Sequence, residues 1–272
     1  MNILKHKTII DEASSYSAKL PRLNILDVKV NAINMSQSVE TIDSWIARQE
    51  QNYVCITGFH GIMICQKDSD LLRIHNTSGL TTPDGMSIVW ILQSKGYHSV
   101  SRVYGPDLML AVCEHSAHGG NYRHFMYGGL PGVAEQLANV LTTRFPGLQV
   151  VGTYSPPFRP LTLEEDQNII EKIDATNPDI IWIGIGTPKQ ERWMSAHMGR
   201  VNASVMIGVG AAFDFLSGHK KQAPYWMQRH GMEWFFRLMA EPRRLWRRYI
   251  KLPYFAWLLF AQTLGIRHYP ED

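Results

Sequence analysis

Two aspartates follow turns of the kind that expose side chains to a ligand. Asp84 lies in Pro83-Asp84-Gly85, just before a predicted helix, and Asp214 ends the glycine-containing run Gly208–Asp214. A carboxylate in such a place can act as a general base on a hydroxyl group, so Asp84 is a candidate catalytic residue. Alternatively, Asp84 is only a helix N-cap or turn residue, and Asp214 has only a structural role.

Two other polar residues have the chemistry needed to bind a phosphorylated sugar. Arg102 precedes a tight turn, and a guanidinium group binds phosphate oxygens in a bidentate way. Gln190 follows the glycine turn in Ile181–Glu191 and can pair with donors and acceptors of a sugar or a uracil ring. The alternative for Arg102 is an ordinary surface arginine.

One short sequence resembles a metal-binding motif. Asp68-Ser69-Asp70 spells the D-x-D with which many metal-dependent glycosyltransferases hold manganese. Here it falls inside a predicted helix, Met63–His75, rather than after a strand, so we interpret it as a solvated helix face. His115 and His118 lie near Cys113, but no further ligand pattern supports a site. The sequence therefore predicts no metal and no cofactor.

Alternation of short apolar runs with helical patterns predicts the framework that positions these residues. Such alternation indicates an α/β fold with a Rossmann-like, mainly parallel sheet covered by helices. In these sheets, ligands bind beyond the carboxyl ends of the strands. The apolar runs are Asn24–Ile33, Tyr53–Thr57, His124–Tyr127, Leu148–Thr153, Ile180–Gly184 and Val205–Val209.

The C-terminal part of the chain is basic and aromatic. From Gly218 to Asp272 there are ten Lys/Arg against four Asp/Glu, whereas the rest of the chain has 17 against 20. Arginines and aromatic residues alternate in Met232–Ile250, and Leu252–Ile266 is apolar. This last segment is shorter than the ~18 residues needed to span a bilayer, but it can lie in a membrane interface. We predict an N-terminal extension (1–23), an α/β domain (24–231) and a membrane-associating helical appendage (232–272).

Five motifs follow one another along the chain: TPDGMSIVW from Thr82, RVYGPDLM from Arg102, GIGTPKQERW from Gly184, GVGAAFDFLSG from Gly208 and GMEWFFRLMAEPRRLWRRY from Gly231. In this order they resemble the WecG/TagA/CpsF family, glycosyltransferase family 26, over about Asn24 to Tyr249. The resemblance implies transfer of N-acetylmannosamine, its uronic acid, glucose or a related sugar from a UDP-sugar. The acceptor would be an undecaprenyl-diphosphate-linked saccharide in the synthesis of bacterial cell-surface polysaccharides.

The resemblance also implies roles for individual residues. Asp84 matches the family's proposed catalytic base, Arg102 and Gln190 match the nucleotide-sugar site, and Thr57 matches a threonine near the sugar. Three arginines match the basic appendage that is thought to close over the active site at the membrane: Arg237, Arg244 and Arg247.

Two positions depart from the family pattern. Many members have asparagine two residues after the Thr57 position, where this chain has Phe59 followed by His60. Either His60 takes over the polar role or the sugar specificity differs. Gln222 stands where many members have an arginine before Ala-Pro, so one charged contact is in doubt.

The function predicted from the sequence is an inverting, metal-independent glycosyltransferase. Its expected partners are a UDP-sugar, a lipid-linked acceptor and an anionic membrane surface on the cytoplasmic side, without nucleic acid; self-association is left open. An NAD-dependent oxidoreductase is a second interpretation, but it requires an early G-x-G-x-x-G and an acidic residue ~20 positions later. A third is a non-catalytic, membrane-docked scaffold that uses only the basic tail.

Overall fold

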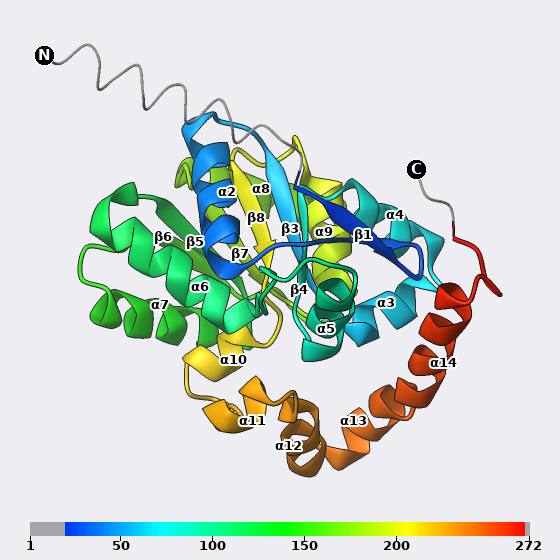
Figure 1. Ribbon diagram of the computed structural model, residues 1–272. Coiled ribbons are helices and arrows are strands. Elements are labelled where there is room, and N and C mark those ends of the chain that lie inside the picture. The colour runs from blue at the N-terminus through cyan, green and yellow to red at the C-terminus, as the bar shows by residue number, and fades with distance from the viewer. Residues whose placement is uncertain (1–19, 270–272) are drawn as a thin grey trace, which may run out of the picture.

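A six-stranded parallel sheet forms the centre of the molecule (Figure 1). The structure is a computed structural model that describes residues 20–269, apart from the side chain of Arg244. The strand order is β4-β3-β8-β7-β5-β6, and a separate hairpin pairs β1 with β2. The strands are β1 (Arg22–Ile25), β2 (Val28–Asn31), β3 (Asn52–Thr57), β4 (Leu80–Pro83), β5 (Arg123–Gly128), β6 (Gln149–Tyr154), β7 (Ile180–Gly184) and β8 (Val205–Gly208).

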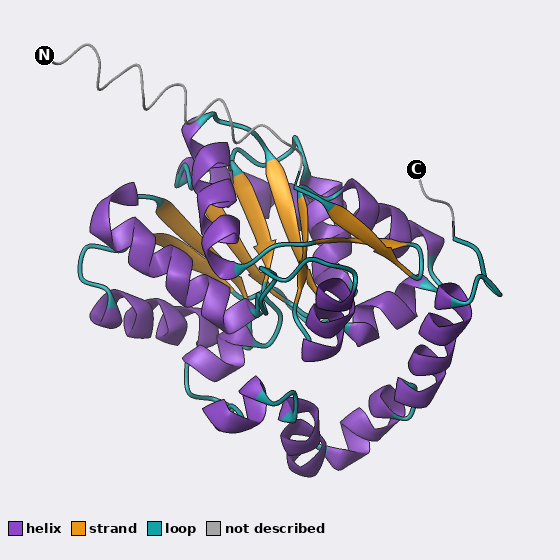
Figure 2. Cartoon of the chain, in the orientation of Figure 1, coloured by secondary structure: helices purple, strands orange, loops and turns teal. Residues whose placement is uncertain are grey.

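Helices cover both faces of this sheet, as Figure 2 shows, so the predicted α/β class is confirmed. In the body these are α2 (Met35–Ala47), α3 (Phe59–Cys65), α4 (Ser69–Thr77), α5 (Met86–Ser94), α6 (Gly105–His115), η1 (Ser116–Gly120), α7 (Val133–Arg144), α8 (Leu163–Ala175), α9 (Lys189–His197) and α10 (Ala212–Leu216). The C-terminal helices are α11 (Tyr225–Arg229), α12 (Glu233–Ala240), α13 (Pro242–Tyr249) and α14 (Leu252–Thr263).

The two faces of the sheet bury separate apolar layers because successive strand residues point to opposite sides. Val54 of β3 joins the layer under α2, α6 and α7, whereas Tyr53 and Cys55 join the layer under α4, α8 and α9. Both sides of the central strands are thereby removed from water. This explains why these strands are continuous apolar runs in the sequence.

The first predicted strand, Asn24–Ile33, is instead a hairpin. The chain reverses at Leu26 and Asp27, whose φ angles are 50° and 71°, and the Asp27 amide donates to Asn24 Oδ1 at 2.7 Å. Two consecutive positive φ angles are typical of a tight two-residue hairpin turn. Because β1 begins at Arg22, it starts inside the predicted N-terminal extension; residues 1–19 of that extension lie outside the described part of the chain.

Strand β4 (Leu80–Pro83) was not among the predicted strands. Two threonines and a proline give it little apolar signal, yet all four residues are buried. It pairs in parallel with β3 and places Thr57 opposite Pro83. Asp84, the candidate base, is the residue that follows this edge strand.

The C-terminal helices form an arc that starts beyond the carboxyl ends of the strands and ends against α3 and the hairpin (Figure 1). Phe255 and Leu258 of α14 are buried in the same cluster as residues of α3 and α5. Gln262 fastens the helix, since its Oε1 accepts from the Leu26 amide and its Nε2 donates to the Asn24 carbonyl. Among residues 20–269, no helix combines the length and the apolar character needed to cross a membrane.

A buried histidine in α4 makes the stability of the fold sensitive to acid. His75 is fully buried, neither ring nitrogen has a hydrogen-bond partner in the described residues, and burial lowers its pKa from 6.5 to about 4. Between these two values the unfolded chain binds a proton that the folded chain does not. The free energy of unfolding therefore falls as the pH is lowered through this range, by on the order of 2 kcal/mol from pH 8 to pH 5.

We expect His75→Leu to remove this contribution, so that the variant loses less stability between pH 8 and pH 5 than the wild type. Urea unfolding at the two pH values measures the difference. His98→Leu is the matched control, because His98 is exposed. An equal loss in wild type and His75→Leu would show that His75 is not a source of the acid sensitivity.

Candidate active site

A cavity of about 470 Å³ lies at the carboxyl edge of the sheet, between the body and the C-terminal helices. Residues that follow β3, β4, β7 and β8 form one side of it, and helices α12 and α13 with Lys251 contribute the other. Strand order explains the convergence, because β4, β3, β8 and β7 are consecutive neighbours. The polar residues on the body side are Thr57, His60, Asp84, Tyr104, Thr187 and Gln190.

Asp84 lies at the cavity wall and is held by its backbone. Its amide donates to the Thr57 carbonyl at 2.9 Å, and its carbonyl accepts from Arg102 Nε at 2.5 Å. The carboxylate contacts Arg102 Nη2 only at 3.4 Å and its side chain keeps 28% exposure. A fixed backbone with a partly exposed carboxylate is suited to accept a proton from a bound hydroxyl group.

Arg102 is not among the residues that line the cavity; it lies behind Asp84. Its Nη2 is 2.6 Å from Glu233 Oε2, and its guanidinium stacks on the Tyr104 ring at 3.9 Å. Burial by itself lowers the pKa of Arg102, but the charges of Asp84 and Glu233 raise it above the usual value. In this arrangement Arg102 is paired with protein carboxylates and is not directed at a phosphate.

Thr57 and His60 follow β3 on the same wall. Thr57 is buried, and a Cβ at Gly61 would lie 2.2 Å from its Oγ1, so glycine is required for this close approach. Burial, followed by the charges of Arg248, Lys251 and Arg237, lowers the pKa of His60 to about 3. His60 is therefore a neutral side chain at ordinary pH, and its Nδ1 has no hydrogen-bond partner in the described residues.

Phe59, at the position where many family members have asparagine, does not offer a polar group. Its ring packs against Tyr249 and Phe255, with centroids 5.9 and 6.0 Å away. This residue therefore contributes to holding the C-terminal helices on the body. His60, the next residue, lines the cavity.

Gln190 is buried at the start of α9 and connects two turns of the cavity wall. Its Oε1 accepts from the Gly210 amide at 3.0 Å, and its Nε2 donates to Glu191 Oε1 at 3.2 Å. Glu191 Oε1 also accepts from Thr187 Oγ1, while burial raises the pKa of the Glu191 carboxyl group. These bonds hold the ends of β7 and β8 in fixed register beside the cavity.

Asp214 is not among the residues that line this cavity. Its Oδ2 pairs with Lys220 at 3.0 Å, and Lys220 also pairs with Glu241 at 3.4 Å, so Asp214 belongs to a contact between α10 and the C-terminal segment. Among the two candidate carboxylates, the structure brings only Asp84 to the cavity.

The C-terminal helices supply positive charge to the cavity. Arg237 and Arg247, both predicted, are in its lining, and so are Arg248 and Lys251, which the sequence analysis did not select. The side chain of Arg244 lies outside the described part of the structure. A cavity with a carboxylate on one side and several cations on the other can bind an anionic ligand and deprotonate a neutral one.

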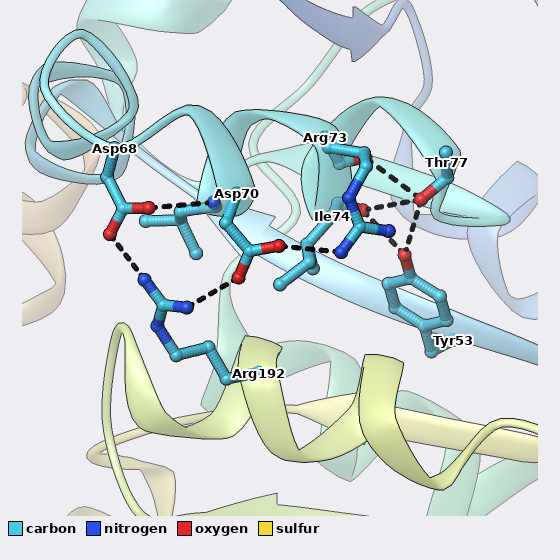
Figure 3. A network of polar contacts seen from close by, with 8 residues as sticks. Tyr53, Asp68, Asp70, Arg73, Ile74, Thr77 and Arg192 are labelled. Atoms are coloured by element: carbon cyan, nitrogen blue, oxygen red, sulfur yellow. Dashed lines mark hydrogen bonds and ion pairs between the residues drawn. The ribbon is translucent and has the colours of Figure 1, made fainter.

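The D-x-D sequence forms an ion-pair network at a solvent-exposed surface (Figure 3). The predicted helix Met63–His75 is interrupted, since Asp68 caps α4 by accepting from the Leu71 amide at 3.0 Å. Arg192 of α9 pairs with Asp68 at 2.6 Å and with Asp70 at 2.5 Å. Across the described residues, no group of three or more His, Cys, Asp or Glu side chains could hold a metal ion.

Two further residues of the site were overlooked in the sequence although they stand in quoted motifs. Tyr104 lies two positions after Arg102, and Glu233 lies two positions after Gly231. The signal for Glu233 was an acidic side chain next to aromatic residues, which is also typical of ordinary amphipathic helices, whereas Tyr104 has no comparable signal in its motif. Only the fold shows that they meet, with Tyr104 Oη donating to Glu233 Oε1 at 3.0 Å.

Comparison of the sequence with known proteins relates the chain to one family. Residues 23–269 match the family described as glycosyl transferase WecG/TagA/CpsF family. A Bacillus subtilis (strain 168) protein named N-acetylglucosaminyldiphosphoundecaprenol N-acetyl-beta-D-mannosaminyltransferase is 30% identical over 194 residues, which is 70% of this chain and 72% of that protein. A protein of the same name from Staphylococcus aureus (strain MRSA252) is 27% identical over 228 residues, 83% of this chain and 87% of that protein.

Proposed function

The chain belongs to the WecG/TagA/CpsF glycosyltransferase family, and from this premise we propose that it transfers an N-acetylmannosamine-type sugar from a UDP-sugar to a polyprenyl-diphosphate-linked acceptor. The names of its relatives support this donor sugar and acceptor class. The observation that carries the proposal is the cavity itself, where Asp84 shares one space with Arg237, Arg247, Arg248 and Lys251.

The proposed reaction is a direct displacement with inversion at the anomeric carbon. Asp84 accepts the proton of the acceptor hydroxyl group while the oxygen forms a bond to the anomeric carbon. The bond between that carbon and the diphosphate breaks, and UDP leaves with the electron pair. The growing charge on the diphosphate is stabilised by the cations of α12 and α13 and by Lys251, which are fixed before the reaction starts.

Thr57, His60 and Gln190 are proposed to contact or orient the donor. Thr57 and His60 lie on the same wall as Asp84, where the transferred sugar would be bound. A neutral imidazole can both donate and accept a hydrogen bond, which suits a sugar hydroxyl or acetamido group. Gln190 has its amide engaged with Gly210 and Glu191, so we assign it the role of shaping the wall that receives the nucleotide.

We propose that residues 232–272 attach the α/β domain (24–231) to the cytoplasmic face of the cell membrane. Within 232–269, six aromatic side chains are exposed: Trp234, Phe235, Trp246, Tyr254, Trp257 and Phe260. Four cations of the same segment line the cavity: Arg237, Arg247, Arg248 and Lys251. Aromatic and basic residues together favour an anionic membrane surface.

A transfer assay tests this function and separates it from its alternatives. Purified protein is incubated with a panel of UDP-sugars and a short-chain polyprenyl-diphosphate acceptor, and calorimetry measures binding of UDP and of NAD. Transfer of one sugar together with UDP binding supports the proposal. Binding of NAD without UDP indicates the oxidoreductase alternative, and absence of both binding and transfer indicates the scaffold alternative.

We expect transfer to continue in EDTA. The D-x-D carboxylates are ion-paired with Arg192, and the diphosphate has four cationic side chains to meet it. The rate is measured with EDTA and again after adding manganese or magnesium. Loss of transfer in EDTA with recovery in manganese would show that the metal-free mechanism is wrong.

A further inference from the structure

Helix α12 places a buried carboxylate behind the candidate base. The Glu233 side chain is only 10% exposed although it comes from the C-terminal appendage and not from the body. Its Oε2 is 2.6 Å from Arg102 Nη2, and its Oε1 accepts from Tyr104 Oη at 3.0 Å. Arg237, one turn later on the same helix, is 3.7 Å from Glu233 Oε1. An acidic residue is rarely buried unless such partners are present.

Arg102 connects this carboxylate to Asp84. One edge of its guanidinium donates through Nε to the Asp84 carbonyl, which fixes the backbone of the base. Its Nη2 is divided unequally between two carboxylates, at 2.6 Å from Glu233 and 3.4 Å from Asp84. The shorter contact belongs to the appendage, so Glu233 competes with the Asp84 carboxylate for this nitrogen.

We propose that Glu233 is a positioning residue for transfer. By binding Arg102, Glu233 of α12 sets the orientation of the Asp84 carboxylate and keeps the lone pairs of that carboxylate free. This inference rests on the proposed function, because it assigns a task within that reaction. The docked appendage therefore does more than supply cations to the leaving group. It also positions Asp84, the candidate base, on the opposite wall of the cavity.

The physical reason lies in competition for one guanidinium. If Glu233 loses its charge, Arg102 has a single carboxylate left and moves onto Asp84, with a short charge-assisted hydrogen bond. Such a bond occupies an oxygen that must receive the acceptor proton and makes it a weaker base. Donor binding should change little, because neither Glu233 nor Arg102 lines the cavity, and Arg237, the lining cation beside Glu233, is held by it only at 3.7 Å.

The test compares Glu233→Gln with Glu241→Gln. Both residues are ion-paired glutamates of the appendage, but Glu241 pairs with Lys220 and lies outside the cavity lining. We expect Glu233→Gln to lower kcat about 10-fold or more, with KM for the UDP-sugar and Kd for UDP within about twofold of the wild type. Glu241→Gln should leave kcat unchanged, and Glu233→Asp, which keeps the charge, should recover part of the rate.

A double-mutant cycle with Arg102→Met tests the route through Arg102. If Glu233 acts through this arginine, Glu233→Gln/Arg102→Met loses no more rate than Arg102→Met alone. Additive losses would overturn the proposal, and so would a Glu233→Gln variant with wild-type kcat. Hydrogen exchange of α12 distinguishes a positioning role of Glu233 from simple anchoring of the helix. If Glu233 only docks the helix, Glu233→Gln shows faster exchange in α12 and a raised KM for the acceptor, while kcat stays normal. If the proposed function itself is wrong, the wild type shows no transfer, and this result differs from every outcome that would overturn the role of Glu233.

Discussion

Replacing Asp84 with asparagine is expected to lower transfer by roughly 100- to 10,000-fold while the protein still folds and binds UDP. Asparagine preserves the size of the side chain and the backbone bonds to Thr57 and Arg102, but it cannot accept the proton of the acceptor hydroxyl group. Initial rates of sugar transfer and calorimetric binding of UDP measure the two properties separately.

Asp214→Asn is the matched control for this variant. Asp214 is the other candidate aspartate, but it lies in α10 and pairs with Lys220 outside the cavity lining. We expect a small effect on transfer, far below that of Asp84→Asn. Near-normal turnover in Asp84→Asn, or a greater loss in Asp214→Asn, would mean that the base has been wrongly assigned.

The second large effect is expected in the appendage, to which we assign a catalytic role on α12 and α13 and a membrane-binding role on α14. Arg247→Ala should lower transfer about 10- to 100-fold, because a charge-assisted hydrogen bond to the leaving diphosphate contributes roughly 1.5–3 kcal/mol. Arg243→Ala removes the same charge from the same helix, but Arg243 is exposed and outside the cavity lining. Its activity should stay close to wild type.

Membrane attachment should respond in the opposite way. Trp257 and Phe260 are 56% and 60% exposed on α14, whereas Phe255 and Leu258 pack into the body. Replacing Trp257 and Phe260 with serine should reduce sedimentation with anionic vesicles while transfer to a soluble short-chain acceptor continues. Arg247→Ala should still bind the vesicles. If it also keeps full activity on every acceptor, the appendage is only an anchor.

Deletion of 232–272 should abolish most transfer and membrane binding, but it is a less specific experiment than these substitutions. The deletion also removes Phe255 and Leu258 from an apolar cluster that includes residues of α3 and α5. Loss of activity could then follow from a weakened body. The point variants leave that packing intact and therefore separate the two roles.

The Glu233 proposal links these two results. If the appendage supports Asp84 through Arg102, transfer depends on α12 being docked as well as on its cations. An enzyme that loses its appendage would then lose both the stabilised leaving group and the oriented base. This gives a physical reason to expect activity only when the C-terminal helices are docked on the body.

The sequence by itself determined the fold class, the family and the principal catalytic candidate. Strands buried on both faces are apolar runs, and the turns after them are local features, so both are visible without coordinates. Asp84 could be selected because its neighbours in TPDGMSIVW form a recognisable motif. The basic and aromatic tail was equally visible, since composition does not depend on tertiary contacts.

Only the tertiary structure decided which of the selected side chains meet. Strand order brings β4, β3, β8 and β7 together and so unites Asp84 with Thr57 and Gln190, while Asp214 turns to Lys220. The same holds for contacts between distant segments: Arg102 and Glu233 are 131 positions apart, and Arg192 of α9 is ion-paired with both D-x-D carboxylates. Sequence patterns record the local preferences of a segment, whereas the partner of a buried charge is set by which segments pack against each other.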